Sequence, residues 1–280
     1  MVEPRRFWQQ HDETLPGLGY GSVPQQGLSH DLYRGMPPWF NAYYAYFQRR
    51  AVLRMLRHCR PLEGKSVLDV GCGTGRWSDL LLTMGAHPTG FDVGERALSL
   101  AKERLGGTKV CVAALPDLGF ADAAFDLALS VTVLQHIPRE RQPQAIAALA
   151  RVLRPGGWLI ACEIVDLKDP AAHVFGNSAA RWQVMFENAG LRLVAYVPCE
   201  YLPYVKLFQR VRSWFGRRGH SESSELGVSS IAALLQRRPL LAWLLRIGVL
   251  LSYPLEFMAS VLLPRRWARL GGFLLMKEAL

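Results

Sequence analysis

Three glycines at alternate positions stand directly after a short apolar run that contains an acid. Residues 67–75 read VLDVGCGTG, with Asp69 inside the run and Gly71, Gly73 and Gly75 after it. Glycine lets the backbone adopt dihedral angles that other residues avoid and approach a bound molecule closely. The helix expected after the turn adds free N–H groups and a positive dipole end. We therefore expect a ligand site at this turn. The acid and the G-x-G-x-G spacing point away from a pyrophosphate and favour a ligand that carries an ammonium group.

Other titratable side chains stand where predicted strands end. Asp92 closes the second predicted strand, 17 residues after Gly75, and His136 follows the fourth. Glu163 and Asp166 lie at the end of the fifth. A carboxylate suits two vicinal hydroxyl donors, and imidazole titrates in the range that a general base needs. Because ligands bind at the carboxyl edge of a parallel sheet, we expect these side chains to lie near one another there.

Each of these residues also has a structural interpretation. Asp69 can cap a helix or bond the glycine turn, and Asp92 can be a turn residue at a strand end. His136 can pack against the loop that carries it without touching a substrate. Residue type and spacing leave both interpretations of His136 open.

Apolar periodicity organises the chain into alternating strands and helices. The predicted strands are 66–70, 88–92, 109–113, 125–131, 158–164, 191–197 and 273–277, and the predicted helices are 39–60, 76–84, 95–105, 139–153 and 179–188. This order predicts an α/β fold: a Rossmann-like seven-stranded, mostly parallel sheet with helices on both faces. Residues 200–269 show helical patterns and few strand signals, so we expect a helical insertion before an antiparallel last strand.

The glycine segment resembles motif I of the class I S-adenosylmethionine-dependent methyltransferases, and further segments match that family in order. These are residues 89–92 (TGFD), 118–126 (LGFADAAFD), 133–137 (VLQHI) and 153–157 (LRPGG). The resemblance covers residues 60–197 and the final strand, and it is strongest for the small-molecule branch called type 11. It implies S-adenosylmethionine as methyl donor and S-adenosylhomocysteine as product, with no metal expected.

The resemblance also implies site residues. Asp69 and the three turn glycines would line the methionine end of the cofactor, and Asp92 would accept both ribose hydroxyls. The implied cofactor-binding set further contains Cys72, Val93, Ala114, Leu115, Ser130 and Arg34, the last of which would reach the cofactor carboxylate. The family usually has an acid after its third strand that contacts the adenine amino group. This chain has Ala114 there, so we expect backbone groups of Ala114 and Leu115 to contact adenine.

The expected reaction is methylation of a small-molecule acceptor. O-methylation of a hydroxyl on a bulky, partly apolar, glycosylated or lipid-like compound is favoured, with His136 as general base and Glu163 or Asp166 orienting or assisting it. N- or C-methylation by proximity alone is one alternative. A catalytically inactive protein that keeps the cofactor site is another. The domains expected are an arm with lid helices (1–60), a cofactor-binding domain (61–199), a helical cap (200–269) and the final strand (270–280).

The net charge of +10 is unevenly distributed. Residues 200–280 contribute +7 and residues 1–199 only +3. The basic residues alternate with Trp and Leu, which favours a substrate lid first and a helix at a membrane surface second, while an ordinary helical subdomain with arginines on its outer face also fits. Nucleic acid is not an expected partner, since no recognition motif is present. The stretch 239–264 is interrupted by Arg246, Pro254 and Glu256, so it does not reach the ~18 uncharged apolar residues of a membrane span.

The cysteines indicate a reducing compartment. Five scattered cysteines show neither a CxxC motif nor metal-ligand spacing, and Cys111 and Cys162 are expected to be buried in strands. The first residues have no apolar core of signal-peptide length. We expect a cytoplasmic protein, with peripheral membrane contact through 200–269 as the alternative, and the sequence does not specify an oligomeric state.

Overall fold

The computed structural model describes residues 37–166, 173–201, 235 and 237–279. The N-terminal arm up to residue 36, with Arg34, and all of 202–234 lie outside the described residues.

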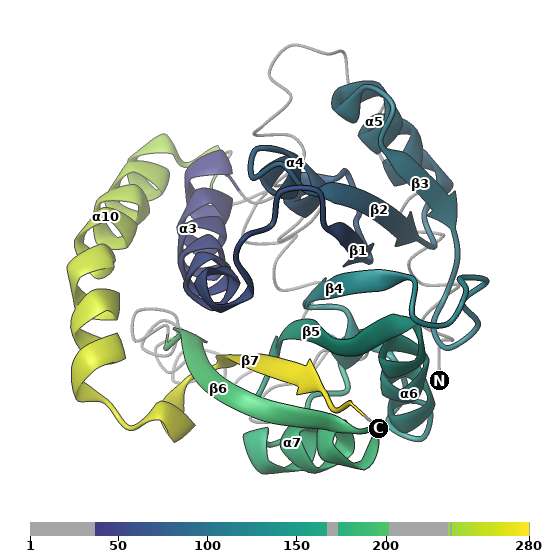
Figure 1. Ribbon diagram of the computed structural model, residues 1–280. Coiled ribbons are helices and arrows are strands. Elements are labelled where there is room, and N and C mark those ends of the chain that lie inside the picture. The colour runs from purple at the N-terminus through teal and green to yellow at the C-terminus, as the bar shows by residue number, and fades with distance from the viewer. Residues whose placement is uncertain (1–36, 167–172, 202–234, 236, 280) are drawn as a thin grey trace.

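The core is a seven-stranded sheet in the order β3-β2-β1-β4-β5-β7-β6 (Figure 1). The strands are β1 (Ser66–Val70), β2 (His87–Asp92), β3 (Lys109–Val112), β4 (Phe125–Val131), β5 (Leu153–Ile164), β6 (Leu191–Glu200) and β7 (Leu270–Lys277). β7 pairs antiparallel with both β5 and β6, and every other pairing is parallel. The predicted fold class, with an antiparallel last strand, is confirmed.

Helices cover both faces of the sheet (Figure 1). The described helices are α3 (Pro38–Leu56), α4 (Arg76–Leu82), α5 (Glu95–Leu105), α6 (Gln142–Val152), α7 (Ala179–Asn188) and α10 (Pro239–Leu262), with short 3-10 turns η1 (Arg57–Cys59), η2 (Leu134–His136) and η3 (Arg265–Trp267). Apolar side chains of α6 and α7 form one core cluster with the sheet, and those of α3 and α4 form a second. Successive strand residues face opposite sides, so Ala128 lies in the first cluster and Leu127 and Leu129 in the second.

The last two strands are longer than their apolar runs predict. β6 continues to Glu200, and β7 begins at Leu270, so Gly271 and Gly272 lie inside a strand. A Cβ at Gly271 would come within 2.5 Å of the Tyr196 hydroxyl, and one at Gly272 within 2.7 Å of the Met55 methyl. These glycines are therefore required by close packing and do not form a turn.

Two other expectations differ from the structure. Cys111 is exposed on β3, because this strand lies at the edge of the sheet, whereas Cys162 is buried as expected. The interrupted stretch from 239 forms one continuous helix of 24 residues, and by length and composition α10 is the one described helix that could cross a membrane. Pro254 lies on its exposed side.

Candidate cofactor and acceptor site

The turn between β1 and α4 has a backbone that favours glycine. Gly71, Gly73 and Gly75 have φ angles of 60°, 51° and 82°, in the left-handed region. A Cβ at Gly71 would lie 2.6 Å from a methyl of Val133, and one at Gly75 would lie 2.5 Å from a methyl of Leu105. Neither Gly71 nor Gly75 could therefore carry a side chain, and the surface of the turn is formed by backbone atoms.

Asp92 ties the end of β2 to this turn. One carboxylate oxygen accepts a hydrogen bond from the Gly73 N–H at 2.9 Å, and the other accepts one from the Gly94 N–H at 3.0 Å. The side chain is half-buried, and each oxygen has lone pairs beyond these two bonds. Asp92 therefore lies beside the glycine turn with acceptor capacity for hydroxyl groups, as its predicted role requires.

Asp69 lies on the other side of the turn and is fully buried. It accepts a 2.6 Å hydrogen bond from the Ser78 hydroxyl, so it also holds α4 against β1. Cys72 is buried within the turn, and a Cβ on Gly90 would come within 2.7 Å of its sulfur. The structural and ligand-binding interpretations of Asp69 are thus compatible.

The end of β3 meets the end of β2 beside this turn. The Ala113 N–H donates to the Asp92 carbonyl at 3.1 Å, which places the following Ala114 and Leu115 next to the end of β2. Val93 is half-exposed at the same place. The structure thus brings the predicted adenine and ribose segments together, while Arg34 lies outside the described residues.

Glu163, at the end of β5, anchors the segment that follows β4. Its carboxylate accepts N–H bonds from Val133, Leu134 and Gln135 at 3.3, 3.1 and 3.0 Å. It also accepts the Ser130 hydroxyl at 3.3 Å. Burial raises the pKa of Glu163 to about 8, against the opposing effect of these hydrogen bonds. Through these bonds Glu163 holds the backbone that carries His136.

His136 ends η2, and its imidazole is held on both nitrogens. Nδ1 lies 3.1 Å from the His173 carbonyl oxygen, which can only accept, so Nδ1 carries the proton and Nε2 is the acceptor. The Gln135 amide nitrogen lies 3.4 Å from Nε2, and the His173 ring stacks on His136 at 5.3 Å. Burial, with a smaller effect from His173, lowers the pKa of His136 to about 3. The ring is therefore neutral at physiological pH, although its pKa is well below the near-neutral value that we expected.

Asp166 is half-buried two residues beyond β5. The preceding Val165 N–H donates to the Arg269 carbonyl at 2.9 Å, so this segment runs beside the start of β7. Thr132, directly after β4, has a left-handed φ of 59°, an uncommon conformation for a β-branched residue. Neither the left-handed conformation of Thr132 nor the contact of Gln135 with His136 could be predicted from the residue types.

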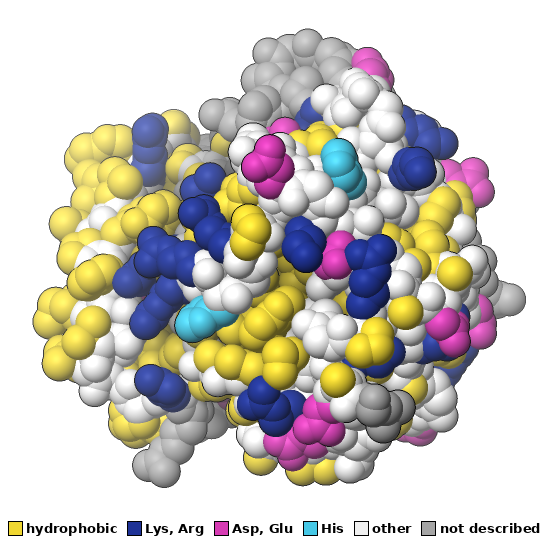
Figure 2. Space-filling view, viewed as in Figure 1, with side chains coloured by type: hydrophobic (Ala, Val, Ile, Leu, Met, Phe, Trp, Pro, Cys, Tyr) yellow, Lys and Arg dark blue, Asp and Glu magenta, His cyan; other side chains and the backbone are white. Residues whose placement is uncertain are grey.

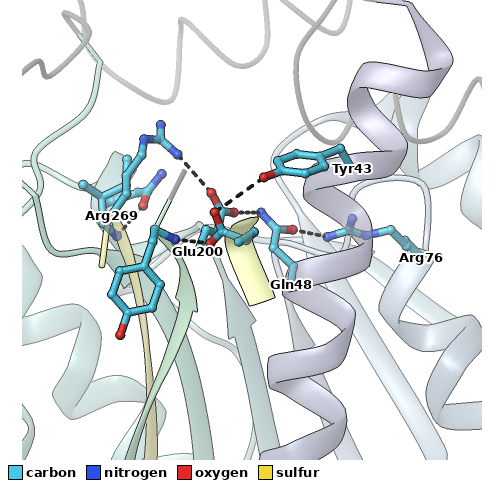
Figure 3. A network of polar contacts seen from close by, with 9 residues as sticks. Tyr43, Gln48, Arg76, Glu200 and Arg269 are labelled. Atoms are coloured by element: carbon cyan, nitrogen blue, oxygen red, sulfur yellow. Dashed lines mark hydrogen bonds and ion pairs between the residues drawn. The ribbon is translucent and has the colours of Figure 1, made fainter. Parts of the chain in front are cut away.

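A buried polar network that no motif indicates lies at the same edge of the sheet (Figure 3). Gln48 donates to Glu200 at 3.2 Å and accepts from Arg76 at 2.9 Å. Arg269 pairs with the other Glu200 oxygen at 3.4 Å. Burial raises the pKa of Glu200 to about 7, against the lowering effects of Arg269 and Gln48. Because Arg76 directly follows Gly75, this network connects α3, β6 and β7 to the glycine turn.

The aromatic stripe of α3 packs inside the protein. Tyr43 and Tyr44 are buried in a cluster with Phe47 and Val249, as the helical spacing favours. The Tyr43 hydroxyl donates to Glu256 of α10 at 3.5 Å (Figure 3). Within the described residues, no group of three or more His, Cys, Asp or Glu side chains could hold a metal ion.

Comparison with known proteins agrees with this geometry. Residues 68–161 match the family model described as a methyltransferase domain of the type 11 family. The chain is 32% identical over 157 residues to a malonyl-[acyl-carrier protein] O-methyltransferase of Erwinia pyrifoliae, covering 55% of this chain and 56% of that one. It is 36% identical over 112 residues to a ubiquinone biosynthesis O-methyltransferase of Thiobacillus denitrificans, covering 38% and 47%. The chain thus spans about half the length of these relatives.

A solved structure has the same fold. The 1,6-didemethyltoxoflavin-N1-methyltransferase of Burkholderia thailandensis, with bound substrate and S-adenosylhomocysteine, matches with a TM-score of 0.51 and 15% identity. The match covers 95% of this chain and 93% of that one.

Proposed function

Because this chain carries a class I S-adenosylmethionine-dependent methyltransferase domain of the type 11 branch, we propose that it methylates a hydroxyl of a bulky, partly apolar small molecule. Glycosylated and lipid-like compounds belong to this class of acceptor. The observation that carries the proposal is the left-handed glycine turn with Asp92 bound to Gly73. Oxygen is favoured as the acceptor atom because two relatives are named as O-methyltransferases.

The residues present fit the cofactor. The turn excludes side chains at Gly71 and Gly75, which leaves backbone against a bound molecule. Asp92 has acceptor capacity for the ribose hydroxyls, and the buried Asp69 supplies negative charge beneath the turn for the amino end. Ala114 and Leu115 offer backbone groups where an adenine ring would lie. When bound, S-adenosylmethionine supplies a methyl group activated on a sulfonium.

His136 is the proposed proton acceptor for the hydroxyl. It follows β4 at the carboxyl edge, where ligands bind in this class of sheet. A neutral ring protonated on Nδ1 has Nε2 as its acceptor atom, which is the form that a general base needs, and a substrate hydroxyl there would take the place of the Gln135 amide at 3.4 Å. Glu163 accepts the three backbone N–H groups directly before His136, so the position of the His136 ring depends on the Glu163 carboxylate.

One observation favours proximity catalysis as the second candidate. The pKa of His136 is lowered to about 3, which makes its imidazole a weaker base than the ideal near neutrality. An acceptor that is already nucleophilic, at nitrogen, carbon or an ionised oxygen, needs positioning only.

His136→Ala separates these candidates. We expect turnover to fall by about 10²- to 10⁴-fold with little change in affinity for S-adenosylhomocysteine. The readouts are transfer of labelled methyl to a panel of phenols, glycolipids and polyprenyl alcohols, and calorimetric titration with S-adenosylhomocysteine. His87→Ala, an exposed histidine at the start of β2, is the matched control.

Each other outcome has a definite meaning. Unchanged turnover in His136→Ala contradicts the base and supports proximity catalysis. Binding of S-adenosylhomocysteine without transfer to any acceptor of the panel supports a catalytically inactive, cofactor-binding protein. No binding at all contradicts the methyltransferase function.

A further inference from the structure

The polarity of α10 is inverted relative to a surface helix of a soluble protein. Its buried residues are Val249, Ser252, Glu256 and Ala259, so the acid and the hydroxyl face the protein. Its exposed residues are large and apolar: Leu240, Trp243, Leu244, Leu250, Leu251, Leu255, Phe257, Met258, Val261 and Leu262. A surface helix normally turns its polar residues to water. Exposed apolar surface of this extent indicates an interaction site.

The inward face holds α10 in a defined orientation on α3. Tyr253 packs edge-on against the Tyr43 ring at 4.9 Å and also contacts the Phe47 ring. Glu256 accepts hydrogen bonds from the Tyr43 hydroxyl and from the Tyr201 N–H. These contacts fix the rotation of α10 about its own axis, and its apolar side therefore faces outward.

Basic residues flank the apolar face of α10. Arg237 and Arg238 precede the helix, Arg246 lies within it and Arg265 follows it, and all four are exposed. The single acid among residues 237–269 is the buried Glu256.

The neighbouring α3 adds a second basic row. Arg50, Arg54 and Arg57 follow one another at helical spacing, and the Arg50 guanidinium lies 4.6 Å over the Phe257 ring of α10. Residues 37–62 contain no Asp or Glu. Figure 2 shows Lys and Arg side chains gathered over α3 beside the hydrophobic side chains of α10.

We propose that the apolar face of α10, with the arginines of α3 and of both ends of α10, docks this protein onto an anionic lipid bilayer. The helix would lie in the plane of the interface, with its apolar side chains among the acyl chains and its arginines at the headgroups. This surface lies outside the glycine turn, and the proposal does not depend on the proposed methyl transfer.

Two other occupants fit the observations less well. A helix spanning the bilayer would have to leave α3 and bring Glu256 and Arg246 into the hydrocarbon, at a large cost in free energy. A second copy of this chain would place one row of arginines against the same row, without acids to neutralise it. Of the three occupants compared, an anionic lipid surface satisfies both the apolar and the basic groups.

The test is flotation of the purified full chain with preformed vesicles. We expect it to float with phosphatidylcholine–phosphatidylserine vesicles, to float weakly with pure phosphatidylcholine, and to lose binding as salt is raised. The triple variant Leu250→Gln, Leu251→Gln, Val261→Gln removes three exposed side chains and should weaken partitioning by about tenfold or more. Arg237→Gln with Arg238→Gln should weaken binding to the anionic vesicles by about fivefold per arginine.

The matched control is Leu82→Gln, Val184→Gln, Val194→Gln, which removes three exposed apolar side chains from α4, α7 and β6. It should float as the unmodified chain does. Far-ultraviolet circular dichroism and the melting temperature check that both triple variants fold.

Four results would overturn the proposal: no flotation with either vesicle, equal flotation of the α10 variant, resistance of the bound protein to alkaline carbonate extraction, or a dimer that only the α10 variant loses. The third result indicates a spanning helix, and the fourth indicates a second copy as occupant.

Discussion

The glycine-turn region and the α3–α10 region differ in the sequence distance that their contacts span. Asp92 reaches Gly73 across 19 positions, and Ser78 reaches Asp69 across 9. Gln48 reaches Glu200 across 152 positions, and Tyr43 reaches Glu256 across 213. Short-range contacts leave a local signature of residue types and spacing, whereas the long-range ones exist only after the sheet has formed. The first region can therefore be recognised in the sequence as a motif, whereas the second cannot.

The two regions also use buried charge differently. Asp92 is half-buried, and its two carboxylate oxygens accept the N–H groups of Gly73 and Gly94 at the glycine turn. Glu200 and Glu256 are buried and bonded to protein donors. We propose that the charge of Asp92 serves binding, whereas Glu200 and Glu256 hold helices and strands together. Four substitutions test that division.

The largest expected effect is on the ligand side. Asp92→Ala removes the carboxylate proposed to accept both ribose hydroxyls, and hydrogen bonds to a charged group contribute about 1.5–3 kcal/mol each. We expect affinity for S-adenosylhomocysteine to fall by about a hundredfold or more in calorimetry. The exposed acid Asp117 serves as control, and Asp117→Ala should bind normally. Normal binding by Asp92→Ala would show that its carboxylate is structural only.

Glu163 lies at the end of β5 and holds the segment after β4, so its loss should affect stability first. Glu163→Ala leaves three backbone N–H groups of residues 133–135 without their acceptor, at a cost of about 3 kcal/mol in the free energy of unfolding. Glu163→Gln keeps one acceptor oxygen and should lose less. Urea unfolding of both variants measures the difference. Equal stability of the two would mean that the carboxylate does not hold the η2 segment.

The third test concerns pH and the α3–α10 region. The pKa of Glu200 is raised from 4.5 to about 7 in the folded chain. The folded chain therefore keeps a proton that the unfolded chain releases above pH 4.5. This contribution to stability is complete below that pH and is lost as pH rises through 7.

Replacing Glu200 with Gln removes the titration. As the pH rises from 5 to 7, the free energy of unfolding of Glu200→Gln should increase relative to that of the unmodified chain by on the order of 2 kcal/mol. Melting curves at both pH values check this. The lowered pKa of His136 affects both proteins equally and cancels. A constant difference between the two proteins would place the pKa of Glu200 near its ordinary value.

The smallest effect is expected at the surface. Asp122→Ala breaks an exposed ion pair with Arg151, and such pairs contribute about 0–1 kcal/mol. Its melting temperature should lie close to that of the unmodified chain. A large drop would mean that surface charges stabilise this fold as much as the buried acids do.

Much of the fold could be predicted because the apolar periodicity of each segment agrees with the way that segment packs in the folded chain. The strand Phe125–Val131 and the helices Glu95–Leu105 and Ala179–Asn188 have the predicted bounds. The last strand was predicted too short: it begins at Leu270 and includes Gly271 and Gly272, against which Tyr196 and Met55 pack. Arg246, Pro254 and Glu256 interrupt the apolar stretch in composition, but one helix runs through all three from Pro239 to Leu262.

The candidate site was predictable to the same degree. The glycine turn and Asp92 lie together as expected, because strand ends and turns are local features that a parallel sheet gathers at one edge. The low pKa of His136 and the bonds of Glu163 to three N–H groups could not be predicted. Burial and hydrogen-bond partners depend on segments that the sequence does not place.

By itself, the sequence determined the α/β class, the order of strands and helices, and the type of cofactor, since apolar period and residue spacing are local properties. Only the tertiary structure decided which side of α10 faces outward, because that depends on Glu256 reaching Tyr43 and Tyr201. From the sequence, the basic excess of the last third of the chain is known only as a net charge, without a position in space. Among the described residues, the fold places Arg237, Arg238, Arg246 and Arg265 beside the exposed apolar face of α10. Side chains from distant parts of the chain form one surface only after their helices have packed.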